Sequence, residues 1–487
     1  MKIGGFEISL RWKRKERRFT AAQQTRLIDW TLGWTRINGQ LKQDYCLMVQ
    51  RARDLAQNNE FVTGYLESLE RNVIGPNGFR LQSLARGVDG AVDQAAAKRI
   101  RELWEVYQSE EFCYVSADER SGGREFDVLI LSTLTIDGEV FIRRLPDPNS
   151  PFGVRYDVLD SLDVDYQYNA ELANGERIVM GIRIDARNRP LSYFVREQTT
   201  DFYQTGRRVE LPASEIIHLF RKRFPGQVRG ITRLAATVLN IAQLDAYKEA
   251  EIIAAKLQAA NCAVYEQTGT GGDLDDDADE NGDVMREMAP GMIGIAPKGR
   301  TIKQITPNHP NSNFGAFVKS ILRGVANSLG NSYNRATGDY ESVNYSSLKA
   351  ATLEDIATFE TLQMWMVAKW KNPQFAEFLR NVLLFGELPF GFRRLPDLMA
   401  HKFYAHHIPC TDLQKEMAGK KIEYELMRTD PITEIEAEGR DPVELLDNWA
   451  RFNAWCAERG LRLTIAPITT MMIDESTEDK KGVANES

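Results

Sequence analysis

The stretch FVKSILRGVANSLGNSYNRATGDYESVNYSSLKAA, from Phe317 to Ala351, places two helical patterns on either side of a polar segment. The first pattern begins at Asn313 and stops at Gly330, because glycine just after an apolar helical run is a common C-terminal signal. Residues 331–347 are polar and contain glycine, so they are expected to form a loop. A long helix is predicted to follow. This succession constrains the fold more than any other part of the chain.

The long helix is predicted from the spacing of its apolar side chains. Ser346 or Ser347 is the expected N-cap, because a serine hydroxyl can accept a hydrogen bond from the free N–H groups of a first turn. Pro373 should kink or end the helix, since proline lacks a backbone donor and clashes with the preceding turn. The apolar face consists of Ile356, Phe359, Leu362, Met366 and Trp370.

A second helix is predicted upstream, in RLAATVLNIAQLDAYKEAEIIAAKLQAA, Arg233 to Ala260. It lacks glycine and proline and is rich in alanine and leucine, and it would span roughly 40 Å. Its alanine stripe indicates close packing against other helices, within one subunit or between subunits. Residues 261–312, between this helix and the one that begins at Asn313, contain short strand-like runs such as CAVYEQ and TIKQITP. Two helices therefore flank a small β insertion.

The part before these helices combines helices with a sheet. Helical patterns cover residues 44–73, 93–118 and 124–135, and strand patterns with turn signals fill residues 136–222. We expect a mostly antiparallel sheet there. His218 lies in the last strand, and no cysteine or carboxylate stands at ligand spacing from it, so we interpret it as a structural histidine.

The bulk composition is that of a globular protein. The chain has 487 residues, a net charge of −8, 43% hydrophobic residues and 27% charged residues. A protein that grips nucleic acid usually carries a basic excess, and only RWKRKERR, Arg11 to Arg18, shows one locally. That run is either a solvated arm or a contact for nucleic acid or an acidic partner. The start of the chain does not resemble a signal peptide.

Several kinds of catalytic and metal site are not expected. No GxxxxGK[ST], GxSxG or HExxH motif is present. The five cysteines are scattered, without a CxxC pair, which favours free thiols over a structural zinc. His406 and His407 form a pair that lacks further ligands at helical spacing. We expect no enzyme, no cofactor and no metal.

An acidic stretch, GGDLDDDADENGD from Gly271 to Asp283, has three possible interpretations: a calcium loop, a solvated loop or an electrostatic surface. Counted from Asp277, it fits four positions of an EF-hand loop. The bidentate glutamate required at the twelfth position is replaced by Met288. The acidic residues are Asp273, Asp275, Asp276, Asp277, Asp279, Glu280 and Asp283.

The order of these features resembles the portal proteins of tailed bacteriophages, within them the lambda-like family. The resemblance covers roughly residues 45–385. Its most specific piece is the stretch quoted first, with GDY and NYSS between two helices. It departs from the family at Ile408 to Glu416, where IPCTDLQKE stands in place of an expected Trp-Asp-Pro motif, and residues 1–44 are unmatched.

The resemblance implies an α+β portal fold with a wing, stem helices, a small β clip, a long kinked helix and a helical crown. The implied division of the chain is an N-terminal arm 1–44, wing 45–232, first stem helix 233–260, clip 261–312, second stem helix 313–330, tunnel loop 331–345, long wing helix 346–385, crown and C-terminal helical region 386–472 and disordered tail 473–487.

The resemblance also implies a function. Such a protein forms a homododecameric ring at a unique capsid vertex, through which double-stranded DNA is packaged and ejected. Its partners would be further copies of itself, the DNA, the large terminase subunit, capsid or scaffold proteins and a neck protein, without a membrane. It would belong to the virion and, during assembly, to the host cytoplasm.

The resemblance further suggests which residues serve these contacts. Tyr340, Asn344, Tyr345 and Ser346 would lie near DNA in the tunnel loop, although the two tyrosines could instead anchor that loop. Lys319 and Arg323 would face the channel or form ion pairs between subunits.

The acidic stretch would then form a rim on the clip, facing a basic surface of the motor or the neck protein. The alternative function is a calcium-dependent binding protein that uses residues 275–288.

Overall fold

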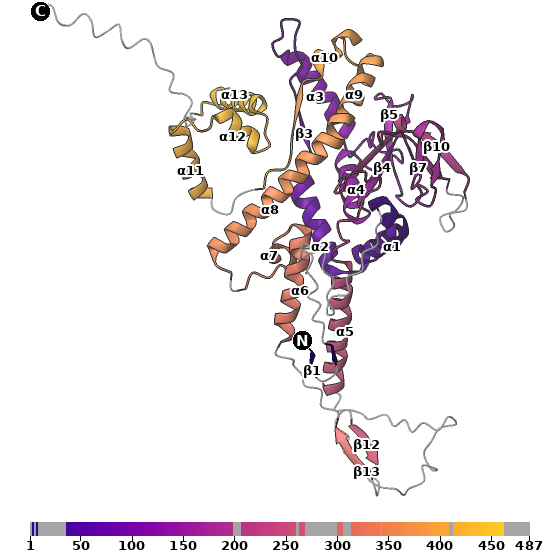
Figure 1. Ribbon diagram of the computed structural model, residues 1–487. Helices are drawn as coiled ribbons and strands as arrows, with labels where there is room; N and C mark the ends of the chain where they lie inside the picture. Colours follow the sequence, from indigo (N-terminus) through magenta and orange to yellow (C-terminus); the bar gives the residue numbers. More distant parts are fainter. Residues whose placement is uncertain are drawn as a thin grey trace, which may run out of the picture.

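The computed structural model describes residues 2–3, 6–7, 36–197, 206–259, 263–267, 300–304, 313–341, 343–408 and 413–461. A body of helices and two antiparallel sheets carries a pair of helices that project from it (Figure 1). The strand pair β12 (Ala263–Gln267) and β13 (Arg300–Gln304) lies beyond the far end of the helix pair. A short pair near the start of the chain consists of β1 (Lys2–Ile3) and β2 (Phe6–Glu7).

The first helical region is longer than predicted and is divided. α1 (Ile37–Asn58) begins seven residues before the helix start predicted at residue 44. Asn59 ends α1 and caps α2 (Glu60–Leu69), accepting hydrogen bonds from the N–H groups of the next turn. A π-helical turn, Glu70–Ile74, then leads to Gly75, whose φ is 70°. A residue with a Cβ would be strained there.

Two further helices pack beside this region: α3 (Gln94–Gln108), which ends ten residues before the predicted residue 118, and α4 (Gly123–Ile136), which matches its prediction closely. Turns in residues 109–118 replace the last part of the predicted helix.

The strand region forms two sheets whose neighbouring strands all pair antiparallel, which confirms the prediction. The larger sheet has the order β10-β9-β8-β7-β6 and the smaller one β11-β4-β5. Their strands are β4 (Glu139–Pro146), β5 (Val154–Leu159), β6 (Ala170–Glu171), β7 (Arg177–Val179), β8 (Ile182–Ile184), β9 (Pro190–Arg196), β10 (Arg208–Pro212) and β11 (Ile216–Phe220).

The projecting pair consists of α5 (Val238–Ala259) and α6 (Phe314–Leu329). α5 starts five residues after the predicted Arg233, because residues 233–237 form turns fixed to the end of α4 by the bond from Arg233 N to Thr135 O, 3.1 Å. The ring of Tyr247 on α5 packs on Phe314 and Phe317 of α6.

The long helix continues through Pro373. α8 (Tyr345–Met366) passes into a π-helical turn, Val367–Lys371, and then into α9 (Asn372–Leu384). Pro373 occupies the first turn of α9, where its missing N–H is tolerated. The helix is therefore interrupted by a π turn and not ended. The predicted apolar face is confirmed, since Phe359, Leu362, Met366 and Trp370 are buried and Ile356 is half-buried.

The chain returns to the body after α9. α10 (Leu395–Leu398) is followed by β14 (His401–Tyr404), which pairs with β3 (Arg80–Ser83). Leu388 and Leu398 belong to the main core. The outer helices are α7 (Tyr333–Thr337), α11 (Leu413–Glu425), α12 (Pro431–Ala437) and α13 (Pro442–Glu458).

A buried carboxylate, Glu139 at the start of β4, joins the sheets to the helices. It accepts hydrogen bonds from Arg229 Nε at 2.6 Å, Tyr45 Oη at 2.5 Å and the Gly230 N–H at 2.7 Å. His218 Nε2 lies 2.8 Å from Glu139 Oε2, the oxygen that also accepts from the Gly230 N–H, whereas Arg229 and Tyr45 donate to Oε1. His218 is buried in this cluster and stacks on Phe141, which confirms its structural role.

The electrostatics of this cluster depend on its donors. Burial by itself would raise the pKa of Glu139, but Arg229, together with His218 and Tyr45, holds that pKa at about 2. Burial also lowers the pKa of His218, against the attraction of Glu139, and so favours its neutral form. The Arg229 guanidinium is completely buried and also donates to the carbonyls of Met180 and Ser161. Its charge thus depends on Glu139.

Replacing Glu139→Gln should destabilise the fold by about 3–5 kcal/mol, because Arg229 would keep a buried charge without a carboxylate. The free energy of unfolding in urea measures this. Glu425→Gln is the control and should change little, since Glu425 forms an exposed pair with Lys421 at 3.9 Å. Equal effects of the two substitutions would contradict the role of Glu139.

The stability that Glu139 provides should depend on pH. Its pKa in the folded state is about 2, below the usual 4.5, so the contribution is complete above about pH 4.5 and is lost as the pH falls toward 2. The difference in unfolding free energy between the parent and Glu139→Gln should therefore shrink over this window. Urea titrations at several pH values test this, and a constant difference would show that the carboxylate is not the source.

Candidate functional site

The segment 331–344 joins the projecting helix α6 to the long helix α8, and it is the candidate site. α6 ends at Gly330, which has a left-handed φ of 73°, and the Asn331 N–H returns to Ala326 O at 3.0 Å. Ser332 then caps the short helix α7. A second left-handed glycine, Gly338, ends α7. The predicted loop thus contains an ordered turn of helix between two glycine caps.

Asp355 of α8 fixes the first half of this segment. It is 2% exposed, and its carboxylate accepts from Ser332 N at 2.6 Å and from Ser332 Oγ at 2.7 Å. Arg335 Nε donates to the same group at 2.9 Å, and its Nη1 reaches Asn72 Oδ1 at 3.2 Å. The segment is therefore tied both to α8 and to the π-helical turn after α2.

Asp339 fixes the second half to α6. Lys319 Nζ lies 2.9 Å from Asp339 Oδ2, and Tyr333 Oη donates to the same oxygen at 3.0 Å. The hydrogen bond to Asp339 raises the pKa of Lys319, and the bonds from Lys319 and then Tyr333 lower the pKa of Asp339. Because this pair is only half-buried, solvent screens it, and it orients the segment more than it stabilises it.

The predicted DNA-facing residues fall into two kinds. The Tyr340 side chain is 56% exposed at the tip of the segment, and Tyr345 and Ser346 are exposed at the start of α8. Asn344 is the N-cap of α8, with Oδ1 accepting from Ser347 N at 2.7 Å, so the prediction of Ser346 or Ser347 as the cap was wrong. The amide side chain of asparagine reaches a free N–H group of the first turn as well as serine does.

The two cations predicted on α6 also differ from expectation. Lys319 is paired within its own chain with Asp339, and its role facing a channel or pairing between subunits stays a prediction. Arg323 lies with its guanidinium carbon 5.6 Å from the Tyr333 ring centre and is exposed. Both cations therefore contact the side chain that begins α7.

Sequence reasoning missed Asp339, Arg335 and Asp355 as the anchors of the segment. One signal was present: Asp355 stands four residues before Phe359 and seven before Leu362, on the face of the long helix that is predicted to be apolar. A carboxylate on a buried face requires partners. The identity of those partners could not be read from spacing, since Ser332 and Arg335 lie 20 or more residues away.

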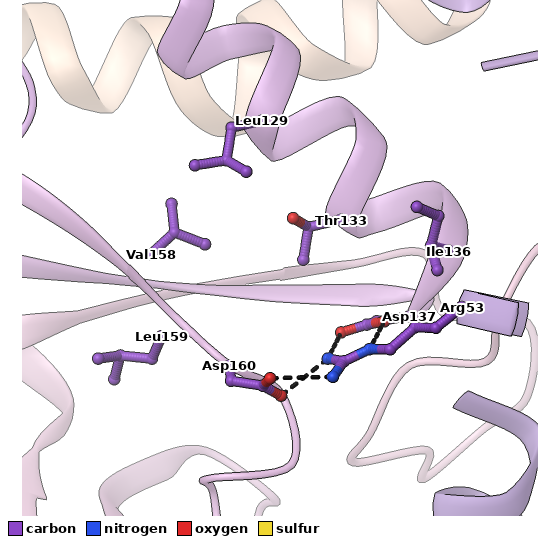
Figure 2. Close-up of a pocket in the computed structure, with 8 residues that line it drawn as sticks. All are labelled: Arg53, Leu129, Thr133, Ile136, Asp137, Val158, Leu159 and Asp160. Carbon is purple, nitrogen blue, oxygen red and sulfur yellow. Dashed lines mark hydrogen bonds and ion pairs between the residues drawn. The ribbon is translucent and has the colours of Figure 1, made fainter. Parts of the chain in front are cut away.

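A separate cavity of about 320 Å³ lies between α1, α4 and β5 (Figure 2). The Arg53 guanidinium sits at its edge and is held by both Asp137, at 2.6 and 2.9 Å, and Asp160, at 2.8 and 2.9 Å. The hydrogen bonds to Asp137 raise the pKa of Arg53. Because the two carboxylates already occupy the guanidinium, we interpret this cluster as a clamp between elements and not as a ligand site.

Other predicted features carry no site in the residues that the structure describes. No group of three His, Cys, Asp or Glu side chains there could hold a metal ion. His406 packs against Gly75, and His407 is half-buried beside it. The helices in these ranges include none long and apolar enough to cross a membrane. The acidic stretch from Asp273 to Asp283 lies outside the described residues.

Known proteins similar to this chain share one description. A family model described as "Phage portal protein, lambda family" matches residues 23–363. A "Probable portal protein" of Halomonas phage phiHAP-1 is 29% identical over 444 residues, which cover 88% of this chain and 85% of that protein. "Portal protein B" of Escherichia phage lambda is 21% identical, over 69% of this chain and 68% of that protein.

Two solved structures carry related descriptions. A chain from the neck of a native gene transfer agent particle, computed with C12 symmetry, is 11% identical with a TM-score of 0.44, covering 82% of this chain and 94% of that chain. An HK97-family phage portal protein from Corynebacterium diphtheriae is 12% identical with a TM-score of 0.38, covering 66% of this chain and 90% of that chain.

Removing the anchor should loosen the candidate segment. Asp355→Ala should increase hydrogen exchange across residues 331–338, because two donors of Ser332 and the Arg335 guanidinium lose their common acceptor. Asp339→Ala is the comparison variant and should loosen mainly the residues after Gly338, since Asp339 is the residue that ties this half of the segment to Lys319 and Tyr333. The same hydrogen-exchange pattern in both variants would contradict the assignment of Asp355 to the first half of the segment and of Asp339 to the second half.

Proposed function

Because the chain belongs to the lambda family of phage portal proteins, we propose that its copies form a ring with a central channel for double-stranded DNA. The proteins of this family are structural and not enzymatic. In this proposal, twelve copies occupy one vertex of the capsid, and DNA enters through them during packaging and leaves through them during ejection. The number twelve is the one that the family resemblance implies.

The projecting pair of α5 and α6 carries this proposal. Two long antiparallel helices that leave a mixed body and lead to a small strand pair are what a stem and clip require (Figure 1). We propose that α5 and α6 form the stem, that residues 261–312 form the clip, and that segment 331–344 is the tunnel loop. The wing would comprise the body from α1 to β11 together with α8, α9 and β14, and α11–α13 would form the crown.

The proposed partners follow from these positions. The clip would dock the large terminase subunit during packaging and the neck protein afterwards. Capsid or scaffold proteins would contact the wing. The protein would assemble in the host cytoplasm and remain in the virion. The similar proteins described above give no support to a calcium-dependent function.

The acidic stretch from Asp273 to Asp283 is proposed as a rim on the clip that meets a basic surface of the motor or neck. Its support is the density of carboxylates in the sequence and its place between the two stem helices. Twelve copies of such a stretch would form a ring of negative charge, which favours a partner with a complementary positive face.

Ring formation is the direct test of the proposed function. Negative-stain images of the purified chain should show rings with a central hole, and native mass spectrometry should give their subunit number. Monomers at every protein concentration would contradict the proposal.

The proposed tunnel loop can be tested without disturbing its anchors. Replacing residues 340–343 with Gly-Ser-Gly-Ser keeps both Asp339 and Asn344 and removes the exposed Tyr340. Rings should still assemble, but capsids built on them should retain less full-length DNA, because the loop could no longer contact the duplex. Full retention of packaged DNA by this variant would show that the loop tip does not act on DNA.

A further inference from the structure

The loop between β11 and α5 carries three exposed cations in succession, Arg221, Lys222 and Arg223. None of the three has an acidic partner among the residues that the structure describes. Two cations near the proposed stem differ in this respect, because Lys319 is paired with Asp339 and Lys248 with Glu60. In a protein with a net charge of −8, three adjacent free cations mark a surface that favours an anion.

The loop backbone is fixed although these side chains are free. Gln227 is buried, and its Oε1 accepts from Arg223 N at 2.8 Å and from Phe224 N at 3.2 Å. Asn38 at the start of α1 donates to Gly226 O at 2.8 Å. The three cations thus project from an ordered turn, and a ligand that bound them would not have to order the backbone first.

The charges in this region repel one another. Partial burial, and then the neighbouring charges of Arg233 and Arg223, lower the pKa of Arg221. Arg233 itself donates to Leu329 O at 2.7 Å, where the C-terminus of α6 presents a partial negative charge. Nothing comparable among the described residues neutralises the three cations of the loop. A bound anion would relieve their mutual repulsion.

The position of this cluster relates it to the proposed channel. Through its bond to Leu329, Arg233 lies at the end of α6, where the 331–344 segment begins. Arg221 is its charged neighbour, and Arg223 in turn is a charged neighbour of Arg221. The free cations therefore adjoin the junction between the proposed stem and the proposed wing, on the chain segment that leads from β11 into α5.

We propose that Arg221, Lys222 and Arg223 contact the phosphate backbone of double-stranded DNA at this junction. The inference rests on the proposed function and deepens it. It assigns the main electrostatic contact with DNA to the β11–α5 loop and not to the 331–344 segment, because Arg335 in that segment is already paired with Asp355. Arginine and lysine side chains bind phosphate oxygens without reading bases, as a duplex of any sequence requires. Exposed side chains on a fixed turn can exchange from one phosphate to the next.

The test compares two triple variants with the same change in net charge. The first is Arg221→Gln, Lys222→Gln, Arg223→Gln. The matched control is Lys98→Gln, Arg187→Gln, Lys369→Gln, at three exposed cations that also form no ion pair among the described residues. Thermal unfolding of both should follow the parent closely, because all six side chains belong to exposed residues.

Affinity for a fluorescent duplex of mixed sequence is then measured by anisotropy over a range of salt concentrations. The first variant should bind more weakly, and its slope of log K against log salt should be shallower by about 0.9 for each phosphate that is no longer neutralised. The control should keep the slope of the parent. Equal slopes for both variants, or a parent that does not bind duplex DNA, would overturn the proposal.

Two further measurements separate the alternatives. If the parent binds polyglutamate, and the first variant loses that binding while its duplex binding is unchanged, the cluster docks an acidic protein and the assignment to DNA is overturned. Negative-stain images of all three proteins report ring formation independently. Rings without a difference in duplex binding would leave the portal function standing and remove only this inference.

Discussion

The buried pair of Glu139 and Arg229 holds the layers of the body together. One carboxylate receives donors from α1, β11 and the chain before α5, so that the helices, the smaller sheet and the base of the projecting helix pair meet at a single charge. Burial of two ions is costly, and hydrogen bonds must satisfy both groups. Here they do, because Arg229 also reaches the carbonyls of Val164, Met180 and Ser161. The path of the chain into α5 is fixed as a result.

The long helix also holds a buried ion pair whose groups are satisfied by hydrogen bonds. Lys371 in its π-helical turn is fully buried and lies 3.1 Å from Asp127 of α4, and Trp370 Nε1 donates to that carboxylate at 2.6 Å. Burial raises the pKa of Asp127 and lowers that of Lys371, and the attraction between them opposes both changes. Nearer the start of the long helix, Asp355 accepts hydrogen bonds from Ser332 and Arg335. The long helix thus connects the proposed tunnel loop to the body through buried charges.

The buried ions described above, Arg229, Lys371 and Asp355, all have charged partners. Exposed cations without such partners therefore indicate a surface available to an anionic ligand. The anchors of segment 331–344 leave its tip with a tyrosine and little free charge, whereas the β11–α5 loop keeps three cations without acidic partners among the described residues. A channel that passes DNA in both directions needs a surface that attracts phosphates but does not hold them in one register. In the proposed channel, a small number of exposed cations together with a weakly charged loop tip would fit that requirement better than a continuous basic lining.

Local sequence signals were enough to predict the kinds of elements and their order. Helix periodicity placed α4 and α6 closely, and alternation with turn signals identified antiparallel strands, because these signals depend on neighbours along the chain. The resemblance in residues 317–351 pointed to the family for the same local reason. The folded chain alone revealed where Asn59 divides the first helix, that β14 returns to β3, and which carboxylate each buried cation meets. Those outcomes depend on contacts between residues far apart in the chain, such as Asp127 with Lys371 and Glu139 with Arg229. Residue spacing along the chain cannot predict such partners.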